Sequence, residues 1–452
     1  MKHFDRFIFD KVDFDPASRE IRLHYALADS TSDMRFMEKI ILPGNSPFSI
    51  LHSQLDAALF ALHLIGGISY YKTCLPKKME IRSGVLNKKQ AAFWNAVYEN
   101  GLGEFFYKNN IDFGGLIQFP FENPPHPNPL PKGEGGLEGG KLLVPIGGGK
   151  DSIVTIELLK KVGLQPTLLR MGHHPLIEEE AKIAGLPLIT LERHLSPLLF
   201  KLNEEGALNG HIPITAYLSI VSVIVAILEG FDAVVMSNER SANVGNVTFK
   251  GMEINHQWSK GLTFENMFQE YLRDAVGTSV QYFSLLRPLS ELHIAKIFSQ
   301  HPQYFDCATS CNTNWRILTS EKRSAVSGQK KWCGTCPKCA FVFACLAAYL
   351  PTKTMTEMFG GNLFADGALL PLYRQLLGIE GFKPFECVGT PEETIAAFLL
   401  AHQRGDFDDT VAMNMFMKDL LPTLKDRHAL IEDALTPSKE HAIPLPYSSI
   451  TP

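Results

Sequence analysis

The sequence has little surplus of charge of either sign. Among its 452 residues, 43 Lys and Arg stand against 48 Asp and Glu, which gives a formal net charge of -5. A protein that covers a large part of a tRNA or of DNA usually carries a basic excess. We therefore expect no nucleic-acid partner, although one local basic groove would not alter this total.

Long hydrophobic runs are also scarce. The most membrane-like segment, residues 211–228 (HIPITAYLSIVSVIVAIL), has no formal charge, but it contains Pro213, Thr215, Ser219 and Ser222 and is short for a spanning helix. A buried helix packed on a sheet is the better interpretation. The N-terminal stretch MKHFDRFIFDKVDFD carries acidic residues where a secretory signal needs an apolar core. We expect a cytoplasmic protein that does not enter the membrane.

Cysteine is sparse but clustered. Five of the eight cysteines fall between Cys307 and Cys339. So few cysteines in a chain of this length do not build a secreted disulfide scaffold, and in a cytoplasmic protein their clustering indicates a metal site or thiol chemistry.

Three of these cysteines have the spacing of a metal site. Cys333, Cys336 and Cys339 form C-x2-C-x2-C, which suits tetrahedral zinc. We expect Cys311 as the fourth ligand, in preference to Cys307 or Cys345. Structural zinc is the leading hypothesis. An iron–sulfur cluster, a redox thiol pair and cysteines that only pack without metal stay open as alternatives.

Composition and hydrophobic periodicity divide the chain into four parts. Residues 1–118 predict a small α+β domain, and residues 119–141 are rich in Pro and Gly and predict a linker or insertion. Residues 142–320 alternate between strands and helices, which predicts a parallel, doubly wound α/β sheet. Residues 321–452 hold the cysteine motif and otherwise predict a mostly helical region. Within the α/β part, the expected strands are 141–146, 165–171, 186–192 and 231–237, with helices at 151–163, 176–185 and 214–229.

A glycine-rich loop joins the first of these strands to its helix, in KLLVPIGGGKDSIVT. Gly147, Gly148 and Gly149 allow close backbone approach, and the free amides of a helix that starts near Asp151 favour an anion. Lys150 adds positive charge and Ser152 a hydroxyl donor. An ordinary tight turn capped by Asp151 is the competing interpretation. The order Lys-Asp-Ser fits neither the P-loop nor the dinucleotide-binding fingerprint.

The loop resembles the S-G-G-x-D-S pyrophosphate loop of the ATP pyrophosphatases with an adenine-nucleotide α-hydrolase fold. Residues Gly148–Ser152 match that motif, whereas Gly147 replaces its leading serine. The resemblance covers about residues 142–320. It implies a Rossmann-like sheet, cleavage of ATP between the α and β phosphates, and Mg²⁺ held with the help of Asp151.

Two further segments are expected at the same edge of the sheet, because ligands bind at the carboxyl ends of parallel strands. These segments are RMGHH and SNERSANVGN. Solvated turn residues and a surface ion pair are the competing interpretations. The nucleotide-binding candidates are Gly147, Gly148, Gly149, Lys150, Asp151, Ser152, Arg170, Gly172, Ser237 and Asn238.

Other motifs narrow the resemblance. The cysteine pattern is similar to that of the 7-cyano-7-deazaguanine synthases, in which an upstream cysteine joins a C-x2-C-x2-C zinc site. The segments NGHIPITAYLS, VVMSNERSANVGN, INHQWSKGLTFE and KPFECVGT, together with residues 311–343, resemble the ATP-dependent UDP-N-acetylmuramoyl-L-alanyl-L-glutamate epimerases of bacterial peptidoglycan synthesis. That resemblance implies inversion of the terminal L-Glu of a nucleotide-sugar dipeptide, with ATP and Mg²⁺ consumed.

Residue type suggests which side chains would carry this chemistry. Proton carriers need a pKa near the working pH, which favours Cys387 and His256, with Glu386 and Cys307 as further candidates. Asp151 completes the catalytic set. Substrate-binding candidates are Arg240, Asn243, Lys260 and Arg316. Two other functions stay open: another ATP pyrophosphatase that forms an amide, nitrile or thiolated product, including tRNA modification, and a non-catalytic ATP-binding regulator. The oligomeric state cannot be deduced from these patterns.

Overall fold

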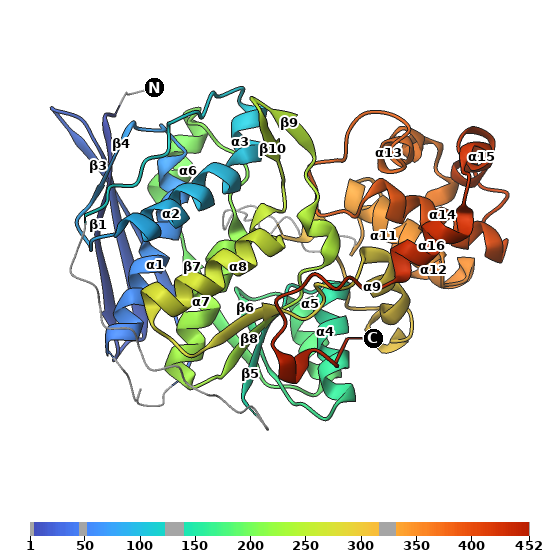
Figure 1. The fold of residues 1–452 in the computed structure, drawn as a ribbon, viewed down its shortest axis with the longest axis horizontal. Helices are drawn as coiled ribbons and strands as arrows, with labels where there is room; N and C mark the ends of the chain where they lie inside the picture. The colour runs from blue at the N-terminus through green and yellow to red at the C-terminus, as the bar shows by residue number, and fades with distance from the viewer. Residues whose placement is uncertain (1–3, 45–51, 123–139, 316–330, 452) are drawn as a thin grey trace.

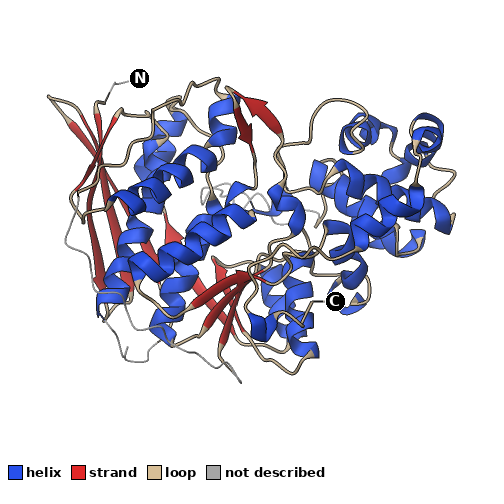
Figure 2. Cartoon of the chain, viewed as in Figure 1, coloured by secondary structure: helices blue, strands red, loops and turns tan. Residues whose placement is uncertain are grey.

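One nine-stranded sheet organises the molecule (Figures 1 and 2). The computed structural model describes residues 4–44, 52–122, 140–315 and 331–451. The strand order is β11-β8-β5-β6-β7-β3-β2-β1-β4, and β9 and β10 form a separate hairpin. The strands are β1 (Arg6–Asp15), β2 (Glu20–Ala28), β3 (Asp33–Ile41), β4 (Lys78–Ile81), β5 (Leu142–Pro145), β6 (Thr167–Met171), β7 (Leu188–His194), β8 (Ala233–Met236), β9 (Val247–Phe249), β10 (Met252–Ile254) and β11 (Gln281–Ser284).

Five of these strands form a parallel half, in the order β11-β8-β5-β6-β7. The chain runs from β5 through β6 to β7 on one side, and then crosses to β8 and β11 on the other. Strand order therefore reverses beside β5, which is where parallel sheets bind ligands. Along β5, Leu142 and Val144 belong to one hydrophobic core and Leu143 to the other, so both faces are covered.

The predicted alternation of strands and helices over this region is confirmed. The uncharged segment forms the buried helix α7 rather than a membrane span, and it begins and ends at the predicted residues, Ile214 and Glu229. Among the described residues, no helix combines the length and the apolar character that crossing a membrane requires. The α-helices in the described part of residues 52–298 are α1 (His52–Tyr71), α2 (Lys88–Gly101), α3 (Gly103–Lys108), α4 (Lys150–Lys161), α5 (Pro175–Ala184), α6 (Pro197–Glu204), α7 (Ile214–Glu229), α8 (Leu262–Tyr271) and α9 (Glu291–Phe298).

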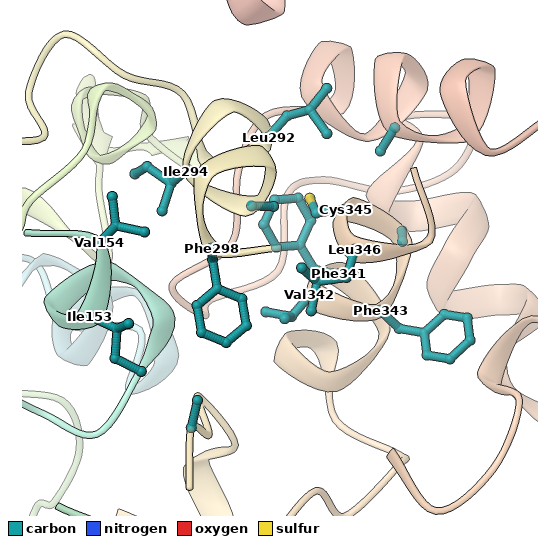
Figure 3. Packing of buried hydrophobic residues seen from close by; sticks show 14 of the residues in the cluster. Ile153, Val154, Leu292, Ile294, Phe298, Phe341, Val342, Phe343, Cys345 and Leu346 are labelled. Atoms are coloured by element: carbon teal, nitrogen blue, oxygen red, sulfur yellow. The ribbon is translucent and has the colours of Figure 1, made fainter. Parts of the chain in front are cut away.

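The two faces of the parallel strands carry different helices. α7 packs on β5 and β8 and against α1, which itself packs on β1 and β2. α4 packs on β5 from the opposite face, and α9 packs against α4. Figure 3 shows how Ile153 and Val154 of α4 meet Phe298 of α9, and how α9 in turn packs against the next helix along the core. The hydrophobic core that contains α4 and α9 continues without interruption into the C-terminal region.

That C-terminal region is helical, as predicted, and lies on the side of the molecule away from β1–β4 (orange and red in Figure 1). Its helices pack mainly on one another and on α9, with α11 at the centre. They are α11 (Pro337–Ala347), α12 (Thr352–Phe359), α13 (Leu370–Leu376), α14 (Pro391–Arg404), α15 (Val411–Asp419) and α16 (Arg427–Leu435).

The N-terminal strands extend the same sheet. β1, β2 and β3 form an antiparallel meander, and β3 then pairs antiparallel with β7, with Lys39 opposite His194 and Ile41 opposite Glu192. The N-terminal α+β segment thus shares a sheet with the α/β part. The boundary at residue 118 stays a prediction, and most of the proposed linker, residues 123–139, lies outside the described residues.

Buried charge reinforces this junction. Glu38 on β3 has no exposed surface and accepts hydrogen bonds from Arg193 on β7 at 2.8 and 3.2 Å. Tyr70 and Tyr217, from the two helices that cover this face, donate to the same carboxylate at 3.0 and 2.8 Å. The Arg193 guanidinium lies 3.8 Å from the centre of the Tyr217 ring. The two halves of the sheet are therefore joined by a fully partnered ion pair.

Replacing Glu38 with Gln should lower the free energy of unfolding by about 3–5 kcal/mol, because it leaves the buried Arg193 charge without its partner. Urea denaturation followed by circular dichroism measures the change. The matched control is Asp33→Asn on the same strand, whose partner is Arg35 and whose ion pair is exposed. This control should change stability little. Equal losses in the two variants would contradict the structural role given to Glu38.

Candidate functional site

The glycine loop lies at the reversal of strand order, directly after β5. Gly148 has a φ of +74°, which an L side chain rarely adopts, and Gly149 is the N-cap residue of α4. A Cβ atom on Gly147 would meet no other atom within 4 Å. Open space beside bare backbone, together with the free amides of a helix start, fits an anion such as a phosphate chain.

Lys150 does not project its charge freely from this loop. Its side chain is buried, and its ammonium group donates to Asp151 at 2.5 Å and contacts the carboxylate of Glu291 on α9. Burial raises the pKa of Glu291, and the nearby Asp151 charge raises it further. The pKa of Lys150 is raised, because Asp151 and Glu291 outweigh burial, so Lys150 is charged as expected but shares its charge with two acidic groups. Its contact with a nucleotide stays a prediction.

Ser152 is held inside the loop as well. Its hydroxyl lies 2.9 Å from the carbonyl oxygen of Gly149 and 3.1 Å from a carboxyl oxygen of Glu180 on α5. Glu180 has no exposed surface, and burial raises its pKa to about 8. A protonated Glu180 can donate to Ser152, which orients the first turn of α4.

The other predicted nucleotide-binding residues also lie at the ends of strands. Arg170, at the end of β6, donates to Thr190, to the carbonyl of His174 and to Glu178, so it anchors the RMGHH turn. Gly172 has a φ of +78° in this turn.

After β8, the Ser237 hydroxyl is buried with no hydrogen-bond partner among the described residues. The Asn238 side chain donates to Ser284 at 3.0 Å. The four residues Arg170, Gly172, Ser237 and Asn238 therefore flank the strand-order reversal, as expected.

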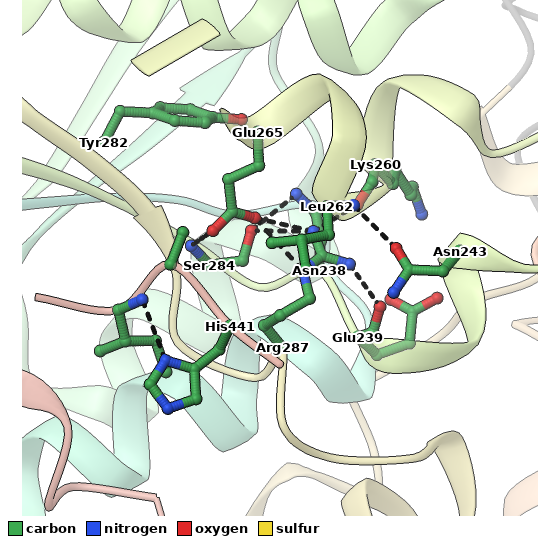
Figure 4. A network of polar contacts seen from close by, with 12 residues as sticks. Asn238, Glu239, Asn243, Lys260, Leu262, Glu265, Tyr282, Ser284, Arg287 and His441 are labelled. Atoms are coloured by element: carbon green, nitrogen blue, oxygen red, sulfur yellow. Dashed lines mark hydrogen bonds and ion pairs between the residues drawn. The ribbon is translucent and has the colours of Figure 1, made fainter. Parts of the chain in front are cut away.

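A buried arginine organises the segments that follow β8. Arg287 pairs with Glu265 at 2.8 Å and donates to the backbone carbonyls of Glu239 and Lys260 at 2.6 and 2.5 Å (Figure 4). Both members of this ion pair are almost completely buried. Because Arg287 holds two separate loops through their backbones, it fixes where the Glu239 and Lys260 side chains begin.

Lys260 is the link between the glycine loop and the predicted proton carriers. Burial alone would lower its pKa, but the negative charges of Cys387, Glu239 and Asp151 raise it above the ordinary lysine value. One ammonium group thus interacts electrostatically with Asp151 of the loop and with Cys387 of the C-terminal region. The charge of Lys260 is therefore stabilised by both predicted chemical centres.

Cys387 and His256 interact, and each displaces the pKa of the other toward its charged form. Burial opposes ionisation of Cys387, yet Lys260, Lys338 and His256 together hold the pKa of its thiol well below the usual value. The pKa of His256 is raised to about 9, because the contacts with Cys387 and Glu104 outweigh burial. The structure therefore favours a thiolate beside an imidazolium at neutral pH.

The structure brings the four predicted metal ligands together. The sulfur–sulfur distances are 4.0 Å for Cys311–Cys336, 3.7 Å for Cys333–Cys339 and 3.4 Å for Cys336–Cys339. Four thiolates at about 2.3 Å from a tetrahedral zinc ion lie about 3.8 Å apart, so this group fits zinc. The other cysteines considered, Cys307 and Cys345, are buried outside the group.

Residues 309–312 connect this cluster to the rest of the site. The Thr309 amide donates to the carbonyl of Gly148 at 2.8 Å, and Cys311 belongs to the cysteine group. The side chain of Asn312 contacts the carboxylate of Glu386, the neighbour of Cys387. One short segment thus ties the glycine loop, the cysteine cluster and the Cys387 loop to one another.

Two predicted substrate-binding residues, Arg240 and Asn243, cap helices with their side chains. Arg240 donates to the carbonyls of Thr436 and Asp433 at 3.0 and 3.2 Å, and so caps the end of α16. The Asn243 side chain accepts from the amide of Leu262 at 2.7 Å and caps α8 (Figure 4). Arg316 lies outside the described residues. Their proposed binding roles stay predictions.

Sequence patterns missed three residues of the site. Glu104 and Glu291 reach it from distant helices, and neither lies in a recognisable motif. Ser310 lies over the glycine loop, where its hydroxyl would be 3.0 Å from a Cβ placed on Gly149. Ser290, which caps α9 by accepting from the amide of His293, marks the helix start that carries Glu291. A Ser before a helical segment is a local signal of a helix start, and it could have predicted the position of α9 but not the role of Glu291.

Known proteins resemble the chain over its full length. Residues 1–285 match the family model described as MurL N-terminal domain, and residues 307–430 match MurL C-terminal domain. Three relatives are named UDP-N-acetyl-alpha-D-muramoyl-L-alanyl-L-glutamate epimerase. Those from a Micromonospora species and from Salinispora tropica are each 38% identical over 99% of this chain, covering 98% and 96% of their own lengths. The relative from Xanthomonas oryzae pv. oryzae is 39% identical over 90% of this chain and 89% of its own length.

The cysteine cluster predicts about one zinc ion per chain, which elemental analysis of the purified protein can measure. Cys311→Ser should lose the metal and lower the melting temperature, because a hydroxyl replaces one thiolate. Cys307→Ala is the matched control and should keep the zinc. Iron with visible absorption, or protein without metal after growth in zinc-supplemented medium, would contradict the zinc assignment.

Proposed function

Because the chain belongs to the MurL family, in which the curated relatives are named as epimerases, we propose that it inverts the terminal L-glutamate of UDP-N-acetylmuramoyl-L-alanyl-L-glutamate to D-glutamate. The substrate would be a nucleotide-sugar dipeptide used in building peptidoglycan. The observation that carries the proposal is that residues 309–312 contact both Gly148 and Glu386, so that the anion-binding loop and the thiolate–imidazolium pair of Cys387 and His256 lie near each other. A reaction that activates a carboxylate and then moves a proton needs both.

We propose further that ATP supplies the activation. The Cα proton of a terminal glutamate is hard to remove, since the adjacent carboxylate is already anionic and cannot absorb more charge. Adenylation would convert this carboxylate into a mixed anhydride whose carbonyl can accept the developing negative charge. Hydrolysis would then release the D-product with AMP, after pyrophosphate has left in the first step. The open space at Gly147 and the start of α4 support pyrophosphate binding there.

The residues in and around the glycine loop would have separate roles in this activation. Asp151, whose side chain is partly exposed, would hold Mg²⁺, which would offset charge on the departing pyrophosphate. Lys260 would face the same region from the opposite loop. Ser310 offers a hydroxyl near Gly149, which supports the view that it replaces the serine absent at Gly147.

The Cys387–His256 pair is the proposed proton carrier. A thiolate can accept the Cα proton from one face, and the imidazolium beside it stabilises the thiolate. Both groups have pKa values displaced toward this charged state. Inversion also requires proton delivery from the opposite face of the planar intermediate. Lys260 is the cationic group that interacts with Cys387 and with the loop, so it is our candidate for orienting the activated carboxyl.

The decisive experiment is an assay in heavy water with the L,L-substrate, ATP and Mg²⁺. We expect AMP and pyrophosphate to form, and deuterium to appear at the glutamyl Cα of the D-product, which mass spectrometry and chiral analysis measure. ADP formation, or inversion without ATP, would contradict the adenylation mechanism. AMP formation with tRNA or free amino acids in place of the dipeptide would favour another ATP pyrophosphatase, and ATP binding without any turnover would favour a regulator.

Replacing Asp151 with Asn should reduce AMP formation by about 10²–10³-fold, because the loop loses the carboxylate proposed to hold Mg²⁺. Circular dichroism should show an unchanged fold. The control is Gly147→Ser, which restores the serine of the motif where a Cβ meets no neighbour. Its AMP formation should change little. Wild-type turnover in Asp151→Asn would discard the role given to the loop.

A further inference from the structure

Glu104 is a buried carboxylate placed against two histidines. It lies in the first turn of α3 with 4% of its surface exposed. Its Oε2 atom contacts Nδ1 of His256 and lies 3.7 Å from Nδ1 of His211, while its Oε1 atom accepts from Lys108 at 2.5 Å. The two imidazole rings lie 4.3 Å apart. Burying a charge is costly, so a carboxylate with this many partners has a defined role in the fold or in the chemistry.

Glu104 contacts His256 although it lies 152 positions before it in the sequence. α3 packs against β10, which leads directly into the His256 segment (Figure 1). The approach is close, since a Cβ atom on Gly101 would lie only 2.6 Å from the Pro213 ring. Glycine at this point lets the end of α2 and the start of α3 reach the 211–213 segment. The N-terminal part of the chain therefore completes a site whose other residues lie beyond residue 140.

The contact with Glu104 determines how His256 can act. An imidazole whose Nδ1 faces a carboxylate carries a proton on that nitrogen. The remaining nitrogen, Nε2, is then the one left for Cys387. We propose that Glu104 is a positioning residue that orients His256 through Nδ1 and so keeps its Nε2 proton directed at the sulfur of Cys387. This inference rests on the proposed role of the Cys387–His256 pair.

Charges around the pair support this arrangement. Although burial alone would raise it, the pKa of Glu104 is lowered to about 2 by His256, His211 and Lys108, so Glu104 stays ionised. Burial lowers the pKa of His211 to about 3, so His211 is neutral and adds no competing cation.

Cys387 also faces charged groups from the other elements around it. Lys260 and Lys338 stabilise its thiolate, the Lys383 ammonium lies near it, and Glu386 opposes it. With these charges unchanged, the Glu104 carboxylate favours the state in which the shared proton is bound to His256 and Cys387 is a thiolate.

A divalent cation is the competing occupant of this place. Glu104, His211 and His256 each offer a ligand atom, and these atoms lie within 4.8 Å of one another. A metal bound through Nδ1 of His256 would have to separate that nitrogen from the Glu104 carboxylate, which it contacts directly. The observed geometry favours the positioning role, and metal analysis distinguishes the two.

The test is Glu104→Gln, which keeps the shape of the side chain and removes its charge. Peptide-resolved alkylation by iodoacetamide as a function of pH reports the thiolate fraction of Cys387 in the folded protein. In the wild type, this thiolate should persist well below pH 8.5. In the variant, the apparent pKa of Cys387 should rise by at least one unit, which lowers its alkylation rate about tenfold at pH values below the wild-type pKa. Deuterium incorporation at Cα should fall in parallel.

Adenylation provides the internal control. Pyrophosphate exchange should be retained in Glu104→Gln, because the glycine loop is untouched, and this also shows that the variant is folded. Glu99→Gln, on the neighbouring helix α2, should leave both readouts unchanged. Glu104→Asp keeps the charge on a shorter side chain and should give an intermediate rate, which also supplies the measurement if the Gln variant does not fold.

The possible failures are separable. An unchanged alkylation profile in Glu104→Gln would overturn the positioning role, and so would a second metal ion per chain that this variant loses. Absence of AMP formation by the wild type would contradict the proposed function and leave the alkylation result to decide the role of Glu104.

Discussion

The pairing of β3 with β7 is the constraint on which the rest of the structure depends. It makes one sheet out of an antiparallel meander and five parallel strands, so the helices attached to each half take fixed positions on common faces. α1 can then pack along α7. α2 and α3 come next in the chain, and α3 packs against β10, near the edge where parallel sheets bind ligands. The buried Glu38–Arg193 pair supports this register, because its two charges meet only when β3 and β7 are aligned. Without that alignment Glu104 would not reach His256.

The C-terminal region is held at the same edge of the sheet by apolar packing and by one short connecting segment. Its helices share the core that contains α4 and α9, so apolar packing alone brings it beside the glycine loop. Alignment at the atomic level comes from residues 309–312, which contact Gly148, the cysteine cluster and Glu386. Metal bound to four cysteines would make this short segment rigid, and rigidity here is transmitted to both the loop and Cys387. Zinc at this cluster would then act as a scaffold of the site rather than as a reacting centre.

The success and the limits of sequence reasoning have physical causes. Periodicity over residues 142–237 predicted the strands and helices, because a sheet buried on both faces demands short apolar strands and helix α7 is apolar on nearly all sides. Dense local motifs predicted the glycine loop and the four grouped cysteines. Periodicity could not show that β3 pairs with β7, since strand pairing is a tertiary choice made over a long separation.

The same limit applies to single side chains of the site. Glu104 and Glu291 are isolated acids on ordinary helices, and only the fold gives them partners. Arg240 and Asn243 stand in a polar stretch after a core strand, where ligand contacts and helix capping demand the same residue types. In the structure both side chains cap helices. Lys260 joins the two chemical centres because Glu239, Asp151 and Cys387 surround it with negative charge. In the proposed reaction, activation and proton transfer would then act on one carboxyl group near one cation, so the substrate would not need to move between them.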